Sequence, residues 1–172
     1  MSRDNERTGA TPHSKVELMA SSAMSRLLII GYGNRLRGDD GAGCRAAELL
    51  QVKLAGAAGV EILAVHQLTP ELMEPISRAR RAIFIDAAAE GAPGEIRRQE
   101  LTAPAATAAF THQATPAALL AGAAVLYGSS ASGVLYTIAG ESFEYAEQLT
   151  PAVERAVAEL VTTIQHAAVG TD

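Results

Sequence analysis

Several features that cross-link or anchor proteins are scarce in this chain of 172 residues. It has a single cysteine, Cys44, so no disulfide can form within the chain, and this fits a reducing cytoplasm. No apolar run reaches the ~18 residues that a membrane-spanning helix needs. The first residues also lack the apolar centre of a signal peptide. These absences predict a cytoplasmic protein that does not associate with a membrane.

The sequence also lacks an excess of positive charge and two common functional motifs. The formal net charge is −5, and lysine and arginine form no basic stripe, which argues against a nucleic-acid partner. There is no Gly-x-Ser-x-Gly segment, so a nucleophilic hydrolase fits poorly. There is no Gly-Lys-Ser/Thr of a phosphate-binding Walker loop. Cys44 falls within a helical pattern and is expected to be a buried structural thiol.

The length predicts one domain, which is large enough to bury a core without disulfides or metal. Residues 1–24 are polar, mixed in charge and without periodicity. We expect them to be a disordered N-terminal extension, or Met24 to be the true first residue. The folded α/β domain is then expected over residues 25–168, and we expect it to act as a monomer.

Strand and helix patterns alternate along this domain. The predicted strands cover residues 26–31, 60–65, 81–85, 94–101 and 133–139. The predicted helices cover 41–55, a short stretch after Thr69-Pro70, 117–126 and 152–166, several of them opened by a Thr-Pro start signal. Residues 94–101 alternate in the manner of a half-exposed edge strand. This order predicts an α/β fold: a three-layer α/β/α sandwich around a mixed, mainly parallel sheet of about five strands.

The most informative segment is 27–43, where an apolar strand meets a glycine-rich turn, two aspartates and a helix. Gly31 and Gly33 suggest a dinucleotide-binding turn, but the third glycine would fall on Leu36. Asp39 and Asp40 would also repel a phosphate at the start of the helix. One aspartate suffices to cap a helix, so the second needs another explanation. Two acids at the carboxyl end of a strand suit a cation, and ligands bind at that edge in open α/β sheets.

Other polar residues are expected at the same sheet edge. Asp86 closes an apolar strand, where a carboxylate must be solvated, hydrogen-bonded, or bound to a cation. His66 follows the second strand, and His112 lies in a loop after the edge strand. Considered alone, Asp86 fits a helix cap or turn residue as well as it fits a metal ligand. His112 considered alone is better interpreted as an ordinary loop histidine. Together, two carboxylates and an imidazole suit an open site for zinc, nickel, manganese or iron.

The chain resembles the hydrogenase maturation proteases, which remove a C-terminal extension from the large subunit of nickel–iron hydrogenases. The pattern Gly-x-Gly-Asn-x-Leu-x-x-Asp-(Asp/Glu)-Gly-x-Gly of that family is matched by Gly31, Gly33, Asn34, Leu36, Asp39, Asp40, Gly41 and Gly43. The acidic Glu141-Ser142 turn and Leu149-Thr150-Pro151 match a further family feature. The resemblance covers nearly all of the chain from Ser25 to about His166.

The resemblance implies a set of catalytic, metal-binding residues: Asp40, Asp86 and His112. It also implies that the nickel already inserted in the large-subunit precursor completes the site, so nickel arrives with the substrate. Neighbouring residues that enter a helix point in different directions. We therefore expect Asp40 to bind metal, and Asp39 to cap the first helix or brace the turn.

Two features depart from the family pattern. The segment 66–72 replaces a glycine-rich stretch that follows the second strand in many members, which leaves His66 as a fourth candidate ligand. Asp40 stands where others have the longer glutamate. Three further functions stay open: a stand-alone metallohydrolase with its own metal, a non-catalytic nickel-binding chaperone, and a nucleotide-binding domain.

Overall fold

The computed structural model describes residues 27–102 and 114–169 and has the layered architecture that the sequence predicts. Its strands are β1 (Leu27–Tyr32), β2 (Val60–Val65), β3 (Arg81–Ala88), β4 (Ile96–Leu101) and β5 (Ser132–Ala139). They form one sheet of five strands in the order β2-β1-β3-β5-β4, in which only β4 is antiparallel to its neighbour. The α-helices are α2 (Ala42–Lys53), α3 (Met73–Arg78), α4 (Pro116–Tyr127) and α5 (Pro151–Val169). The predicted mixed, mainly parallel sheet is confirmed.

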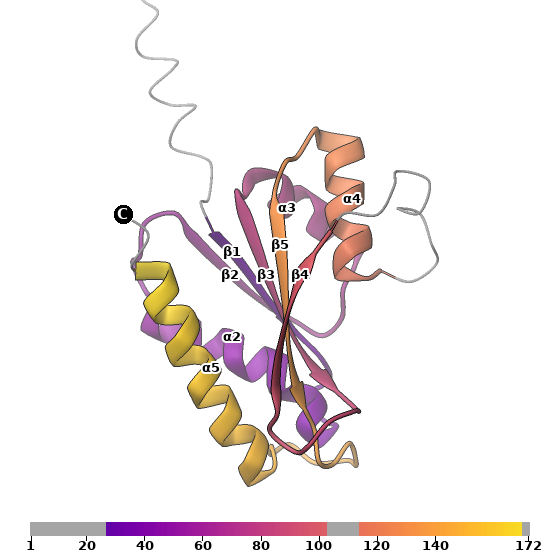
Figure 1. Cartoon of the computed structure of the whole chain (residues 1–172), viewed down its shortest axis with the longest axis vertical. Coiled ribbons are helices and arrows are strands. Elements are labelled where there is room, and N and C mark those ends of the chain that lie inside the picture. Colours follow the sequence, from indigo (N-terminus) through magenta and orange to yellow (C-terminus); the bar gives the residue numbers. More distant parts are fainter. Residues whose placement is uncertain (1–26, 103–113, 170–172) are drawn as a thin grey trace, which may run out of the picture.

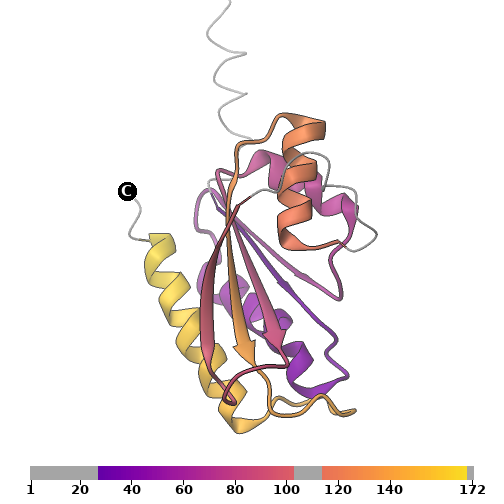
Figure 2. The same cartoon turned by 45° about the vertical axis from the view of Figure 1, so that its right-hand side comes forward.

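The helices cover both faces of the sheet. Helices α2 and α5 pack on one face, and α3 and α4 on the other (Figure 1; Figure 2). Side chains alternate between the two faces along each strand, as the period of two requires. In β1, Ile29 joins the core beneath α2 and α5, whereas Leu28 and Ile30 join the core beneath α3 and α4. The three-layer sandwich is therefore held by two apolar cores.

The bounds differ from the sequence prediction in two informative places. The Thr69-Pro70 signal opens a short 3-10 turn, Pro70–Leu72, before α3 begins. Strand β3 runs past Asp86 to Ala88 because its last residues still pair with β5. Pairing with β1 ends earlier, at Gly31 and Ile85. Asp86 is thus still within β3, one residue beyond the last pair between β3 and β1. Across the described residues, we find no helix with the length and apolar character of a membrane span.

Two glycines of the first motif allow α2 to lie directly on the sheet. A Cβ atom on Gly43 would come within 2.2 Å of the Ile85 carbonyl oxygen and 2.4 Å of the Tyr32 carbonyl oxygen. A Cβ atom on Gly31 would lie 2.0 Å from the carbonyl oxygen of Gly43. All of these contacts are with backbone, which cannot rotate out of the way. The motif therefore sets the distance between α2 and the carboxyl ends of β1 and β3.

Gly43→Ala is accordingly expected to destabilise the fold by about 3 kcal/mol, the upper end of the usual cost of overpacking. Urea unfolding followed by circular dichroism measures the change. Val52→Ala is the control in the same helix, because Val52 is 77% exposed and should change stability by no more than about 0.5 kcal/mol. Equal unfolding midpoints for Gly43→Ala and the wild type would show that α2 can shift freely away from the sheet.

Candidate functional site

An open cleft of about 730 Å³ lies at the carboxyl edge of the parallel strands. Its lining comes from the end of β1, the start of the first helical region, the loop after β2, the N-terminal turn of α4, and single residues of β3, β4 and β5. Asp40 and Asp86 both line this cleft, as does His66. The structure thus brings together two of the three residues that the sequence nominated. The third, His112, lies outside the described residues.

The position of the cleft in the sheet is itself informative. Strand β1 lies between β2 and β3, so the chain leaves β1 toward one side of the sheet and later returns to its other side. Crevices at such a topological switch point are where ligands bind in open α/β folds. The last pair between β1 and β3 is Gly31 with Ile85, so Asp86 lies one residue beyond the paired part of these two strands.

Asp40 closes the glycine-rich turn from within. Its Oδ2 accepts a hydrogen bond of 2.9 Å from the backbone N–H of Asn34. Gly33 takes a φ of +136°, and a Cβ atom there would lie 1.9 Å from the carbonyl oxygen of Asp40. The backbone N–H of Asn34 therefore donates to a carboxylate of the protein itself, whereas a phosphate-binding turn would donate such a hydrogen bond to its ligand. This arrangement argues against the nucleotide-binding alternative.

Asp86 is held by two donors in a partly buried position. Its Oδ1 accepts a hydrogen bond of 2.9 Å from the backbone N–H of Ala87, and the hydroxyl of Tyr32 donates to the same carboxylate. Burial, together with the nearby negative charge of Asp40, raises the pKa of Asp86 to about 6, although both hydrogen bonds lower it. Burial, and then the negative charge of Asp86, raises the pKa of Tyr32, so its hydroxyl stays protonated and can donate. A cation in the cleft would relieve the repulsion between the two carboxylates.

Asp39 has a different role from its neighbour. It is fully buried, and it caps neither Gly38–Gly41 nor α2, so the expected helix cap is wrong. Its Oδ1 accepts from the Thr150 N–H at 2.7 Å. Its Oδ2 accepts from the Thr150 hydroxyl at 2.9 Å and from the N–H groups of Glu141 and Ser142 at 2.8 and 3.0 Å. Burial alone would raise the pKa of Asp39, but these four hydrogen bonds outweigh it, and the pKa is lowered.

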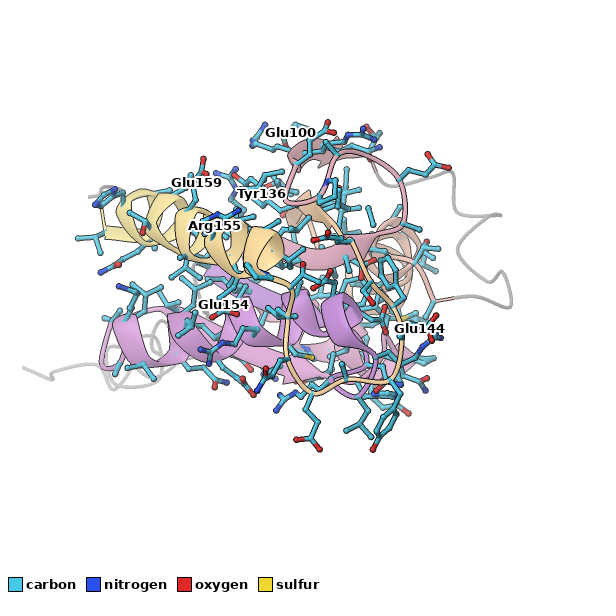
Figure 3. The ribbon with its side chains drawn as sticks, turned by 90° about the horizontal axis from the view of Figure 1, so that it is seen from below. Glu100, Tyr136, Glu144, Glu154, Arg155 and Glu159 are labelled. Atoms are coloured by element: carbon cyan, nitrogen blue, oxygen red, sulfur yellow. The ribbon has the colours of Figure 1, made fainter. Side chains whose placement is uncertain are left out.

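Asp39 therefore braces the turn by tying it to the loop that joins β5 to α5. Figure 3 shows this loop crossing the carboxyl end of the molecule, with Glu144 on it and Glu154 in the first turn of α5. Further backbone bonds join the same two segments: Gly38 N–H to the Ala146 carbonyl at 2.8 Å, and Ala146 N–H to the Leu36 carbonyl at 3.1 Å. The loop and the glycine-rich motif are thus joined by hydrogen bonds at several points.

Histidine and cysteine complete the inventory of possible ligands. His66 is exposed at the rim of the cleft. In the two described ranges, no three side chains of His, Cys, Asp or Glu are placed to hold a metal ion together. Cys44 is buried, and its thiol donates to the carbonyl oxygens of Val65 at 3.1 Å and Gly33 at 3.3 Å. Burial raises the pKa of Cys44, so it remains a neutral structural thiol.

The sequence predicts no role at the site for Tyr32 or Thr150. Tyr32 falls between two motif glycines, just beyond the strand predicted over residues 26–31. Its place on the same face of the sheet as Asp86 is nevertheless a consequence of the period of two in paired strands. In the sequence, Thr150 belongs only to a helix-start signal and to the Leu149-Thr150-Pro151 family feature. Nothing local indicates that its hydroxyl and N–H both reach Asp39.

Fold and site together define a doubly wound α/β protein with an acidic cleft at its switch point. No family model matches the sequence, and neither does any curated protein. Solved structures do match. A hydrogenase 2 maturation peptidase from Thaumarchaeota archaeon SCGC_AB-539-E09 superposes with a TM-score of 0.64 at 25% identity, over 86% of this chain and 99% of that one.

Two further solved structures lead to the same class of protein. The [NiFe] hydrogenase maturation protease HycI from Thermococcus kodakarensis KOD1 gives a TM-score of 0.68 at 23% identity, over 90% of this chain and 99% of that one. The hydrogenase maturating endopeptidase HybD from E. coli gives 0.66 at 23% identity, over 85% and 93%. The chain therefore has the fold of the hydrogenase maturation proteases over almost their whole length, which confirms the resemblance that the first motif predicts.

Proposed function

We propose that this chain is an endopeptidase that removes the C-terminal extension from the large-subunit precursor of a nickel–iron hydrogenase. The observation that carries this proposal is the placement of Asp40 and Asp86 in one cleft of a fold shared with hydrogenase maturation proteases. Fold alone does not define an activity, so the two carboxylates carry the chemical part of the argument.

The cleft suits a chain segment that presents its own metal ion. It is open at the sheet edge, and its volume of about 730 Å³ falls in the range of sites that hold small ligands or short peptides. Two carboxylates with one imidazole, the predicted His112, form a donor set without thiolate, suited to a divalent transition metal. We propose that the nickel bound in the precursor supplies this ion, so that the metal is part of the substrate.

In this reaction the protease residues act mainly by positioning. Asp40 and Asp86 take the free coordination positions of the nickel and thereby fix the precursor's C-terminal segment in the cleft. The ion then polarises the scissile carbonyl or activates a water molecule. Asp86 must lose its proton to bind the metal, and its pKa of about 6 makes this loss favourable at neutral pH.

The decisive experiment compares nickel-loaded with nickel-free precursor at equal protease concentration. Mass spectrometry should show the shortened large subunit and the released peptide only from the nickel-loaded precursor. Asp40→Asn should abolish the cleavage, because an amide is a poorer metal ligand than a carboxylate. Glu48→Gln is a matched control in the helix that follows, and it should retain the wild-type rate.

Other outcomes distinguish the alternatives. Equal cleavage of both precursors, or one tightly bound zinc per purified chain, would favour a stand-alone metallohydrolase. Binding of the nickel-loaded precursor without any change in its mass would favour a nickel-binding chaperone.

A further inference from the structure

Among the described residues, Tyr32 is the only Phe, Tyr or Trp that lines the cleft. It ends β1, one residue beyond the last pair with β3, and therefore lies next to Asp86 on the same face of the sheet. Its ring packs against the core beneath α3 and α4, to which Leu28 and Ile30 of the same strand also belong. An aromatic ring that is fixed in this way presents its hydroxyl from a constant position.

That hydroxyl donates its hydrogen bond to the carboxylate of Asp86. The other donor to this carboxylate, the N–H of Ala87, belongs to the adjacent residue and leaves the side chain free to rotate about it. A second donor from a different strand restricts this rotation. Asp86 lines the same cleft as Asp40, so the orientation of its carboxylate matters for a ligand bound there.

We propose that Tyr32 is a positioning residue, whose hydroxyl orients the Asp86 carboxylate toward the metal-bearing substrate. This inference rests on the proposed function and deepens it. Carboxylate ligands are oriented by hydrogen-bonding partners of this kind, and loss of such a partner lowers metal affinity or activity by about 10- to 100-fold. Tyr32 itself need not contact the substrate.

The test is Tyr32→Phe, which removes the hydroxyl and keeps the packed ring. We expect kcat for processing of the nickel-loaded precursor to fall by about 10- to 100-fold, with KM changed by less than about threefold. Tyr136→Phe is the matched control, since Tyr136 is a half-buried strand tyrosine that lies on the α5 side of the sheet, away from the cleft (Figure 3). It should retain the wild-type kcat.

A second measurement tests the contact without substrate. In a double-mutant cycle of unfolding, Tyr32→Phe and Asp86→Ala should be non-additive, because both remove the same hydrogen bond. A wild-type kcat for Tyr32→Phe, or a loss no larger than that of Tyr136→Phe, would overturn the inference, and so would strict additivity in the cycle. If the wild-type chain processes no precursor while the cycle shows coupling, the proposed function fails and the contact stands as structural only.

Discussion

Asp86→Asn is expected to make the free protein more stable at neutral pH while reducing processing of the nickel-loaded precursor by about 100-fold or more. The gain in stability has an electrostatic origin. A carboxyl whose pKa rises from 3.8 to about 6 on folding costs the folded state about 3 kcal/mol at neutral pH. Solvent in the open cleft screens part of this cost, so we expect a measured gain of about 1–2 kcal/mol. The loss of processing follows from the loss of a metal-binding carboxylate.

The sign of the pH dependence provides a sharper test than a single measurement. The folded protein holds the Asp86 proton more tightly than the unfolded chain does. Asp86 therefore contributes a loss of stability to the wild type as the pH rises from about 4 to about 6, and this loss is complete above the folded pKa. Asp86→Asn lacks this dependence. The two proteins should unfold at nearly the same urea concentration at pH 4 and separate progressively up to pH 7.

Glu90→Gln is the control for this comparison, because Glu90 is an exposed acid shortly after β3. It should change neither stability nor processing. A variant Asp86→Asn that is less stable than the wild type at pH 7 would refute the assigned burial of this carboxylate. Retention of processing by the variant would remove Asp86 from the site. Residues of enzyme active sites commonly lower the stability of the folded protein, and Asp86 is expected to follow this pattern.

The sequence predicted the fold and the general place of the site because both depend on local patterns. Each strand and helix has its own periodicity, and the alternation of the two leaves few topologies for the sheet. The apolar run before Asp86 placed this residue at the carboxyl edge, although β3 in fact continues to Ala88. That continuation depends on pairing with β5 beyond the end of β1, which no local pattern reveals.

Contacts between distant segments account for what the sequence could not predict. Asp39 and its partner Thr150 are 111 residues apart, so the brace emerges only when the chain is folded. The same holds for the hydroxyl of Tyr32 on Asp86, which joins two strands separated in sequence by β2 and α3. Two adjacent aspartates with similar sequence contexts thus have opposite roles: Asp39 is enclosed by donors, and Asp40 faces the cleft.

This contrast predicts a large difference in stability between matched substitutions at the two positions. Asp39→Ala should destabilise the protein by about 3–5 kcal/mol, because it leaves three partly buried backbone N–H groups without their acceptor, each at a cost of about 1–3 kcal/mol before water enters. Asp39→Asn should cost about 2–3 kcal/mol. Both carboxylate oxygens of Asp39 accept hydrogen bonds, so the NH₂ group that replaces one of them would face donors instead of acceptors. Asp40→Asn should cost less than about 1 kcal/mol, because its remaining carbonyl oxygen can still accept from Asn34.

Chemical unfolding and processing assays on the three variants separate the two roles. Below its own melting temperature Asp39→Asn should still process the nickel-loaded precursor, whereas Asp40→Asn should be folded and inactive. The pKa of Asp39 is lowered in the folded state, so its contribution is present above about pH 4 and is lost as the pH falls through the folded pKa. The deficit of Asp39→Ala should shrink over that acidic range. If Asp40→Asn were the less stable of the two asparagine variants, or if Asp39→Asn alone were inactive while folded, the roles of the two aspartates would be the reverse of those that the hydrogen bonds indicate.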